Sequence, residues 1–426
     1  MHEVLYGKGN DIMNRNIAPA QLLVFFMQRI YDQGLTTMSG GNLSVRDEEG
    51  NIWITPSGID KGSLTPEDIV CVSPDGICHG KHAPSCELPF HSGVYRLRPD
   101  VRAILHAHPP VPVSFSIVRR LPLQDLVCAT AQGEMSMAGY DVPGSAALGE
   151  KVCRVFAKGQ NIAMMENHGV CVVAPEMFTA FRRFVLLNYS AELELAARRL
   201  GTPQPAPCVR RLRPAEGQPG PAGAEAAAQE ILKLTRRCCR TGLFTAAQGS
   251  CSVRLPQGGF LLTPSDLDLA LLEPEDLLWV PDGTETVQTE AQLHAALYRA
   301  RPEVNAVITA QPPYLTAFAV CHRYLDARTI PESYIQLRDV LYEAFDRYYD
   351  APEAVAARFA PAKPALLAEN VGAVTTGDTL LKAFDRMEVM EATARSVIDT
   401  APLGEIIHIT DEEIEALVEA FGLPRA

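Results

Sequence analysis

Apolar and polar positions follow helix and strand periodicities from the start of the chain. Residues 18–32 carry apolar side chains along one face of a helix, so this segment is predicted to be helical. Residues 43–46 and 51–55 are short strand-like runs on either side of the turn-forming sequence DEEG, which predicts a hairpin. The chain therefore opens with a helix followed by paired strands.

Further helices and strands alternate beyond this hairpin. Residues 87–98 and the long amphipathic segment 177–199 are predicted to be helices. Apolar runs at 103–108, 162–166 and 169–173 predict strands. Such a mixture favours a three-layered α/β domain around a central sheet, although the order of the strands does not follow from the pattern.

The same series of short motifs occurs twice. Three pairs match at an offset of 208 positions: 40–46 (GGNLSVR) with 248–254 (QGSCSVR), 54–58 (ITPSG) with 262–266 (LTPSD), and 64–69 (LTPEDI) with 272–277 (LEPEDL). Two more match at an offset of 203: 98–101 (RPDV) with 301–304 (RPEV), and 166–169 (ENHG) with 369–372 (ENVG). One five-residue deletion accounts for the change of offset. Chance matches would scatter, so one fold is predicted to be written twice.

A stretch rich in proline and glycine separates the two copies. Residues 206–223 read APCVRRLRPAEGQPGPAG, a composition that forms neither a helix nor a central strand. We therefore predict a first domain over 1–205, an extended linker over 206–223 and a second domain over 224–426. The total of 426 residues agrees with two domains of roughly 100–200 residues each.

The charge balance excludes some classes of protein. The chain has 38 Lys and Arg against 51 Asp and Glu, a formal net charge of −13. A protein that binds nucleic acid without sequence preference needs a basic surface, and so does one held to a membrane by polybasic segments. We therefore expect neither a nucleic-acid partner nor a membrane partner.

Three features predict a cytoplasmic location. No apolar stretch approaches the roughly 20 residues of a membrane-spanning helix. The first 16 residues lack the basic start and apolar core of a secretion signal. The 11 cysteines are odd in number and contain no CxxC pair, so reduced thiols are the simplest interpretation.

Three histidines are candidate metal ligands. His106 and His108 lie two residues apart on a predicted strand, where alternate side chains share a face. His168 lies in a turn between two apolar runs, next to Gly169, which permits a close backbone approach or a positive φ. Ordinary hydrogen bonding explains such histidines equally well when each is taken alone. Together they would form a three-histidine site with an open position, the pattern of catalytic zinc.

Glu87 is the candidate acid or base. It opens the helix predicted over 87–98, where an acidic residue is ordinarily a capping or dipole partner. Beside a metal ion it would instead move protons. His91 shares its helix face, and we interpret His91 as structural because the second copy retains its counterpart, His294.

Three glycine- and serine-containing loops are candidate anion sites, although each is also a common kind of turn. They offer backbone N–H groups, hydroxyls or an amide, and the third leads into a helix N-terminus. Their candidate residues are Gly41, Asn42, Ser57, Gly58, Ser85 and Cys86.

The order of these motifs carries a resemblance to a known family. GGN, TPSG, PSxE, HxH and NHG, in this order, resemble the class II aldolase/adducin family, most closely its L-fuculose-phosphate aldolases. The resemblance covers about residues 15–200 and, more weakly, 224–400. It implies two tandem α/β/α layered domains, each with a central, largely antiparallel sheet.

The resemblance also implies roles for the candidate residues. His106, His108 and His168 match the family's zinc ligands, and Glu87 matches its catalytic acid/base. Three imidazoles also accept Mn²⁺, Co²⁺ or Fe²⁺. Gly41, Asn42, Ser57, Gly58, Ser85 and Cys86 fall where the family binds the substrate phosphate. The implied activity is that of a zinc-dependent aldolase that makes or cleaves a ketose 1-phosphate through the enediolate of dihydroxyacetone phosphate.

Two departures qualify the match. Cys86 stands where the aldolases usually have a second phosphate-binding serine, and a thiol is a weaker donor. The tyrosine of the aldolases has no clear counterpart, since Leu126 occupies the nearest position. A sugar-phosphate dehydratase or decarboxylase, which the same family scaffold hosts, is an alternative. A non-catalytic adducin-like scaffold is another, although a scaffold has no need of the intact histidines and Glu87.

The second copy has lost the candidate metal ligands. Thr309, Gln311 and Val371 stand opposite the three histidines, and Asp266 stands opposite Gly58. We therefore predict a folded but catalytically inactive second domain. Because simple members of the family form four-fold rings, the resemblance implies a homodimer that builds a pseudo-four-fold ring.

Overall fold

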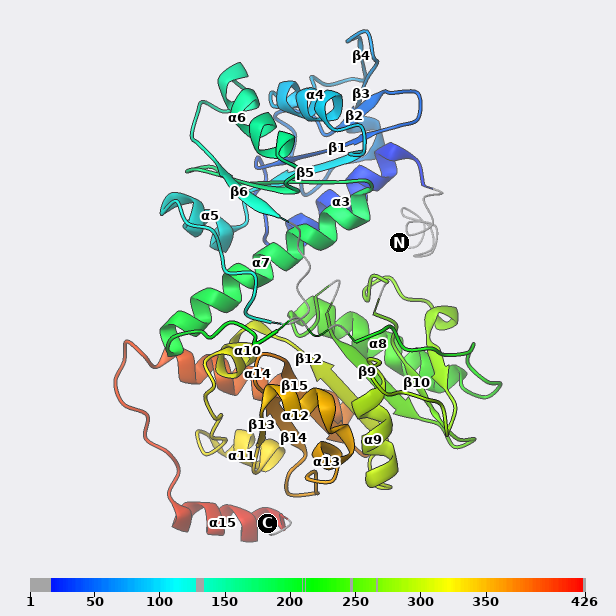
Figure 1. The fold of residues 1–426 in the computed structure, drawn as a ribbon, viewed down its shortest axis with the longest axis vertical. Coiled ribbons are helices and arrows are strands. Elements are labelled where there is room, and N and C mark those ends of the chain that lie inside the picture. Colours follow the sequence, from blue (N-terminus) through cyan, green and yellow to red (C-terminus); the bar gives the residue numbers. More distant parts are fainter. Residues whose placement is uncertain are drawn as a thin grey trace. The chain divides into compact units, whose positions relative to one another are not determined.

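The computed structural model describes residues 17–127, 134–208, 210, 212–245, 248–265 and 267–423. They form two compact units (Figure 1). The first unit comprises the chain up to Leu123 and Ala131–Glu192, and the second comprises Gln124–Thr130 and Leu193–Ala426. Asp266, which stands opposite Gly58 in the second copy, lies outside the described residues.

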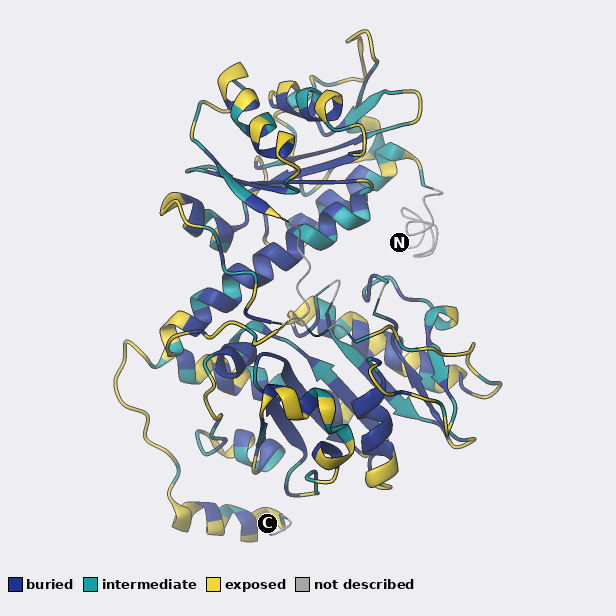
Figure 2. Ribbon diagram, viewed as in Figure 1, coloured by how far each residue is buried: buried dark blue, intermediate teal, exposed yellow. Residues whose placement is uncertain are grey.

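The first unit contains a mixed, largely antiparallel sheet in the order β4-β3-β2-β1-β5-β8-β7-β6. Only β6 and β7, among its described strand pairs, run parallel. Its strands are β1 (Asn42–Arg46), β2 (Ile52–Ile54), β3 (Val70–Val72), β4 (Cys78–His79), β5 (Ala103–Ala107), β6 (Met135–Ala138), β7 (Ile162–Met165) and β8 (Val170–Ala174). Figure 2 shows the central strands as buried.

Helices cover both faces of this sheet (Figure 1). They are α3 (Pro19–Asp32), α4 (Leu88–Leu97), α5 (Pro110–Ile117), α6 (Ala146–Ala157) and α7 (Met177–Leu200), with a short 3₁₀ turn at Pro66–Asp68. The last part of α7, from Leu193 on, belongs to the second unit. On one face, Phe90 of α4 and Phe156 of α6 pack with Ile104 and Val173 of the strands. The helices predicted over 18–32, 87–98 and 177–199 are thereby confirmed, with ends that differ by at most one residue.

The second unit repeats the arrangement. Its sheet has the order β11-β10-β9-β12-β15-β14-β13, and β13 pairs in parallel with β14. The strands are β9 (Ser250–Arg254), β10 (Phe260–Leu262), β11 (Leu278–Val280), β12 (Ala306–Ala310), β13 (Leu341–Glu343), β14 (Ala365–Ala368) and β15 (Gly372–Gly377). This order corresponds strand by strand to the order β3-β2-β1-β5-β8-β7-β6 in the first sheet. The prediction of one fold written twice is therefore confirmed.

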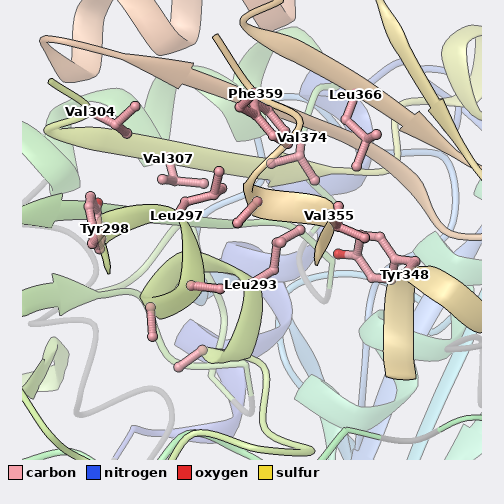
Figure 3. Packing of buried hydrophobic residues seen from close by; sticks show 14 of the residues in the cluster. Leu293, Leu297, Tyr298, Val304, Val307, Tyr348, Val355, Phe359, Leu366 and Val374 are labelled. Atoms are coloured by element: carbon pink, nitrogen blue, oxygen red, sulfur yellow. The ribbon is translucent and has the colours of Figure 1, made fainter. Parts of the chain in front are cut away.

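The helices of the second unit are α8 (Glu225–Thr241), α9 (Gln292–Ala300), α10 (Pro313–Val320), α11 (Pro331–Leu337), α12 (Phe345–Asp350), α13 (Pro352–Ala356), α14 (Leu380–Asp399) and α15 (Asp411–Phe421), with a 3₁₀ turn at Pro274–Asp276. Figure 3 shows Leu293 and Leu297 of α9 packed with Val307, Val355 and Phe359. No helix in the described part of the chain is long and apolar enough to cross a lipid bilayer.

Part of the linker pairs with the second sheet. The N–H of Gln218 donates to the carbonyl of Trp279 in β11 at 2.9 Å, and the N–H of Trp279 donates back at 2.8 Å. In the first sheet, the equivalent of Trp279 is Cys71, which pairs with His79 of β4. The linker therefore lies where β4 lies in the first unit. The five-residue deletion falls in this region, and the described second sheet has no strand of its own there.

Candidate metal centre

His106 is held at the middle of the first sheet. It lies in β5, is fully buried, and its Nδ1 is 2.9 Å from the carbonyl oxygen of Val170 on β8. Because a carbonyl only accepts, Nδ1 carries the ring proton and the lone pair is on Nε2. Pairing of β5 with β8 thus fixes both the tautomer and the direction of this ring.

His108 and His168 reach the same point from neighbouring segments. His108 follows the end of β5, and its Nε2 lies 3.1 Å from His106 Nε2. His168 lies in the turn between β7 and β8, where Asn167 has a φ of 51°. A Cβ on Gly169 would lie 2.5 Å from His108 Cδ2, so close approach is the reason for glycine here. The positive φ falls on Asn167, not on the glycine.

One ring nitrogen from each of the three histidines lies within 4.8 Å of the others. Among the described residues, no other group of three or more His, Cys, Asp or Glu side chains is arranged in this way. Three nitrogens bound to one zinc ion at about 2.1 Å would lie roughly 3.4 Å apart, so the cluster has the dimensions of a metal site. The described part of the second unit has no counterpart.

The three imidazoles are neutral at pH 7. Burial lowers the pKa of His106, of His108 and of His168 to about 4 in each case. A neutral imidazole has a lone pair to give, whereas a protonated one has none. The site is therefore ready for a cation over the physiological pH range.

Glu87 points at the histidines and does not cap its helix. It is the N-cap residue of α4, yet its side chain makes no capping hydrogen bond. Its Oε2 lies 3.2 Å from His106 Nε2, and its Oε1 lies 3.6 Å from His168 Nε2. Glu87 as a whole is 5% exposed. Oε1 has no hydrogen-bond partner among the described residues, and neither does His168 Nδ1.

This donor set fits a divalent cation. His106 Nε2 and Glu87 Oε2 face each other without a proton between them, because the His106 proton is on Nδ1. Two such lone pairs at 3.2 Å repel unless a positive charge lies beside them. The Glu87 Oε1, which has no hydrogen-bond partner among the described residues, would also be stabilised by a nearby positive charge.

A buried chain of hydrogen bonds holds Glu87 in place. Asn42 Nδ2 donates to Glu87 Oε2 at 2.7 Å, and Asn42 Oδ1 accepts from His91 Nε2 at 2.6 Å. The other ring nitrogen of His91, Nδ1, lies 2.6 Å from Ser44 Oγ, which is 2.7 Å from the Tyr95 hydroxyl. Burial, followed by the nearby His106, lowers the pKa of His91 well below 6.5, so His91 is neutral and donates only from Nε2.

The candidate phosphate residues lie in adjacent loops. The N–H of Ser57 donates to the Ala83 carbonyl at 3.1 Å, which joins the loop of Ser57 and Gly58 to that of Ser85 and Cys86. Ser57, Gly58 and Cys86 are exposed, whereas Ser85 is buried and its Oγ accepts from the N–H of Glu87 at 3.3 Å.

The remaining two candidates, Gly41 and Asn42, lie beside the histidines. Gly41 has a φ of 71°, and a Cβ there would lie 2.5 Å from the carbonyl oxygen of His106. Both ends of the Asn42 amide are bonded to Glu87 and His91. Sequence reasoning did not find this positioning role, because it depends on the pairing of β1 with β5.

Leu126, the nearest position to the missing tyrosine, is buried and apolar. Its backbone carbonyl accepts a hydrogen bond from Asn370 Nδ2 at 2.9 Å. A leucine side chain has no proton to give, so it takes no part in acid chemistry.

Comparison with known proteins identifies the family. Residues 21–195 and 229–398 match the Class II Aldolase and Adducin N-terminal domain. These two segments make up most of the chain, so the protein belongs to this family. The resemblance found in the motifs is confirmed, and so is its presence in both copies.

Individual relatives have two kinds of activity. The chain is 28% identical over 185 residues to the 5-deoxy-D-ribulose 1-phosphate aldolase of Bacillus thuringiensis serovar kurstaki, which covers 43% of this chain and 86% of that protein. It is 27% identical over 184 residues to the 3-oxo-tetronate 4-phosphate decarboxylase of Haemophilus influenzae, covering 42% and 87%. It is 28% identical over 174 residues to the L-fuculose phosphate aldolase of Methanocaldococcus jannaschii, covering 39% and 91%.

A solved L-fuculose 1-phosphate aldolase is 29% identical, covers 44% of this chain and 90% of its own, and has a TM-score of 0.41. Each relative thus spans about one of the two copies.

Proposed function

We propose that this protein is a metal-dependent aldolase that cleaves or forms a ketose 1-phosphate, with dihydroxyacetone phosphate and a small aldehyde as the other reactants. The observation that carries the proposal is the unpartnered, buried Oε1 of Glu87 beside three neutral histidines. A scaffold protein has no need to bury a carboxylate in this position. The aldolases among the relatives support the same class of reaction.

His106, His108 and His168 would hold the metal, with Zn²⁺ first and Mn²⁺, Co²⁺ or Fe²⁺ as alternatives. When bound, a divalent ion supplies Lewis-acid stabilisation of the negative charge that develops on the substrate oxygens. The Val170 carbonyl and the close contact at Gly169 keep the rings in position before any ligand arrives.

Glu87 would move the proton. In the condensation direction, Oε1 takes a proton from the hydroxymethyl carbon of dihydroxyacetone phosphate, and the C–H electron pair becomes part of the enediolate. The enediolate carbon then bonds to the aldehyde carbon, and the aldehyde oxygen takes up a proton from a group other than Leu126. Cleavage is the reverse, with Glu87 returning its proton to carbon. Asn42 holds Oε2 throughout, which leaves Oε1 free.

Gly41, Asn42, Ser57, Gly58, Ser85 and Cys86 are proposed as the phosphate site. Asn42 Nδ2 carries two N–H groups and Glu87 Oε2 accepts from one of them, so a contact between Asn42 and a phosphate does not require the release of Glu87. Ser57, Gly58 and Cys86 are exposed and would meet the phosphate at the surface.

A sugar-phosphate decarboxylase is the second candidate. It is favoured by a specific observation, namely relatives of that activity at 27–30% identity. Decarboxylation breaks a bond to a carboxylate carbon and needs no aldehyde partner, so the absence of the tyrosine would matter less.

Product analysis separates the two reactions. The metal-loaded full chain is incubated with ketose 1-phosphates, and dihydroxyacetone phosphate is followed by its enzymatic reduction. A 3-oxo acid phosphate is incubated in parallel and the release of CO₂ is measured. The proposal expects dihydroxyacetone phosphate and an aldehyde. CO₂ without aldolase products would establish the decarboxylase, and a purified chain that takes up no divalent ion would favour the scaffold.

We also propose that two chains form a pseudo-four-fold ring in which the second domains supply neighbouring surfaces. Light scattering tests this assembly. A stable, active monomer would contradict it.

A further inference from the structure

Lys61 is a buried cation close to the candidate phosphate loops. Lys61 is 3% exposed. Its Nζ donates to the carbonyl of Pro56, the residue directly before Ser57 and Gly58. An ammonium group has three N–H donors, and no second acceptor is bonded to Nζ among the described residues. No carboxylate in that part of the chain lies within ion-pair distance of it.

A buried ammonium without a counter-ion is unfavourable. Burial removes its hydration, which lowers the pKa of Lys61, while proximity to Cys86 acts in the opposite direction. Proteins bury such a charge when it is paired, and the pair can be completed by a ligand. An anion that arrives with the substrate would supply the missing partner.

The surroundings of Lys61 suit an anion. The Pro56 and Pro84 backbones form a bridge, which brings the segment that leads to Ser85 and Cys86 beside the one that bears Lys61. The exposed Ser57, Gly58 and Cys86 supply only neutral donors. Lys81, in the segment that leads to Ser85, is paired with Asp68 at 3.0 Å, whereas Lys61 has no such carboxylate partner among the described residues.

The second unit shows that the fold does not require the lysine. Its counterpart is Leu269, which is 2% exposed. The preceding aspartates act alike in both copies, since the Gly62 N–H donates to Asp60 Oδ1 at 2.9 Å and the Ala270 N–H donates to Asp268 Oδ1 at 3.0 Å.

The start of the loop is also the same. The Leu43 N–H donates to Thr55 Oγ1 at 3.1 Å, and the Cys251 N–H donates to Thr263 Oγ1 at 3.1 Å. The copy that lacks the metal ligands has therefore replaced the buried charge by an apolar side chain without changing these contacts. A structural role alone does not explain why the first copy retains a lysine.

We propose that Lys61 binds the phosphate of the substrate and makes the site selective for a phosphorylated over an unphosphorylated compound. This inference rests on the proposed function, in which the substrate is a sugar phosphate. Lys61 approaches the phosphate from the protein interior, while the exposed loop residues bind it from the surface.

The test compares two ligands that differ only by the phosphate. Binding of phosphoglycolate and of glycolate to the zinc-loaded full chain is measured by calorimetry for the natural protein and for Lys61→Leu. We expect phosphoglycolate to bind at least tenfold more weakly to the variant, while glycolate binding and zinc content stay unchanged. Lys158→Leu removes an exposed charge at the end of α6 and is the matched control, with both affinities unchanged.

Three results would overturn the inference: equal affinity of the natural protein for both ligands, unchanged phosphoglycolate affinity in Lys61→Leu, or an equal loss for both ligands. If Lys61→Leu does not fold, a crystal structure of the natural protein with phosphoglycolate decides. A phosphate oxygen within hydrogen-bond distance of Nζ supports the inference, and a phosphate bound elsewhere overturns it.

These results are distinguishable from failure of the proposed function. If the chain cleaves no ketose 1-phosphate but needs Lys61 to bind phosphoglycolate, the proposed reaction is wrong and the phosphate site at Lys61 stands. If the chain is an active aldolase and Lys61→Leu does not change its affinity for phosphoglycolate, only the role of Lys61 is wrong.

Discussion

The two units have the same buried polar chain but end it differently. Ser44 Oγ lies 2.7 Å from the Tyr95 hydroxyl and 2.6 Å from His91, and Ser252 Oγ lies 2.7 Å from the Tyr298 hydroxyl and 2.8 Å from His294. This Tyr–Ser–His arrangement occurs with and without metal ligands, so it belongs to the fold.

The far end of the chain carries the difference. In the first unit, His91 bonds Asn42, which holds the carboxylate that faces the three histidines. In the second unit, His294 Nε2 lies 3.0 Å from the hydroxyl of Thr309, the residue that replaces His106. The hydroxyl satisfies the histidine and needs no ion. The comparison teaches that, in the second copy, an internal hydrogen bond to a hydroxyl takes the place of the contacts around the candidate metal site.

The linker adds a second difference. The backbone carbonyl of Arg213 accepts a hydrogen bond from the N–H of Glu290 at 3.1 Å, and the backbone N–H of Arg213 donates to the Gln288 carbonyl at 2.9 Å. Gln288 and Glu290 correspond to Ser85 and Glu87, so the linker lies along the segment that carries substrate-binding candidates in the first unit. That segment is thus engaged by backbone pairing in the second unit.

The largest expected effect comes from removing one metal ligand. His106→Ala should lose the metal, and turnover should fall to background, because two imidazoles hold a divalent ion weakly. Thr309→Ala at the matched position should leave metal content and turnover unchanged. Metal analysis and kinetics of both variants check this. Equal damage from the two substitutions would break the comparison of an active and an inactive copy.

Glu87→Gln should have the next largest effect. The amide retains the size of the side chain and an oxygen for Asn42, but it cannot take a proton. We expect unchanged metal content and a turnover number lower by about 10²–10⁴-fold. Metal content and steady-state kinetics are measured together. Near-normal turnover in this variant would remove Glu87 from its assigned role.

Acid should destabilise the second unit through His294. Burial lowers the pKa of His294 to about 3, against about 6.5 in an unfolded chain. Between these values the unfolded state binds the extra proton, so stability falls as pH falls through this window. The loss from this group is about 2 kcal/mol between pH 7 and pH 5.

Denaturant unfolding of the second unit at several pH values checks this loss. His294→Gln should flatten the dependence. A slope that is the same in variant and natural protein would show that other groups carry it.

The smallest effect is expected in the linker. Gln218→Pro removes the N–H that bonds Trp279 and should lower the free energy of unfolding of the second unit by about 1 kcal/mol, with metal content unchanged. Glu216→Pro is the control, because its N–H makes no backbone hydrogen bond within the described structure. Thermal unfolding that is equally affected by both would argue against the linker as an added strand.

Local sequence patterns predicted the helices and strands better than the tertiary contacts between them. Residues 103–108 were recognisable as a strand from their apolar run, and alternation placed His106 and His108 on one face. His168 lies next to these two histidines because Ala107 pairs with Val170, and this is a contact between residues far apart in sequence. The resemblance to a family supplied that link, which periodicity alone does not contain.

Other features had no local signal at all. Asn42 looked like a loop residue for binding anions, whereas the pairing of β1 with β5 sets its amide on Glu87 and His91. Lys61 was not distinguished from a surface lysine, because burial follows from tertiary packing. The pairing of Gln218 with Trp279 is a tertiary contact at the edge of the second sheet, so linker composition could not show it.

The central claim is that one chain holds one metal ion, in the first unit. An anomalous-scattering map from a crystal of the zinc-loaded protein tests it directly. We expect a single peak per chain at coordination distance from His106, His108 and His168. A peak at Thr309, Gln311 and Val371, or no peak at the three histidines, would contradict the account.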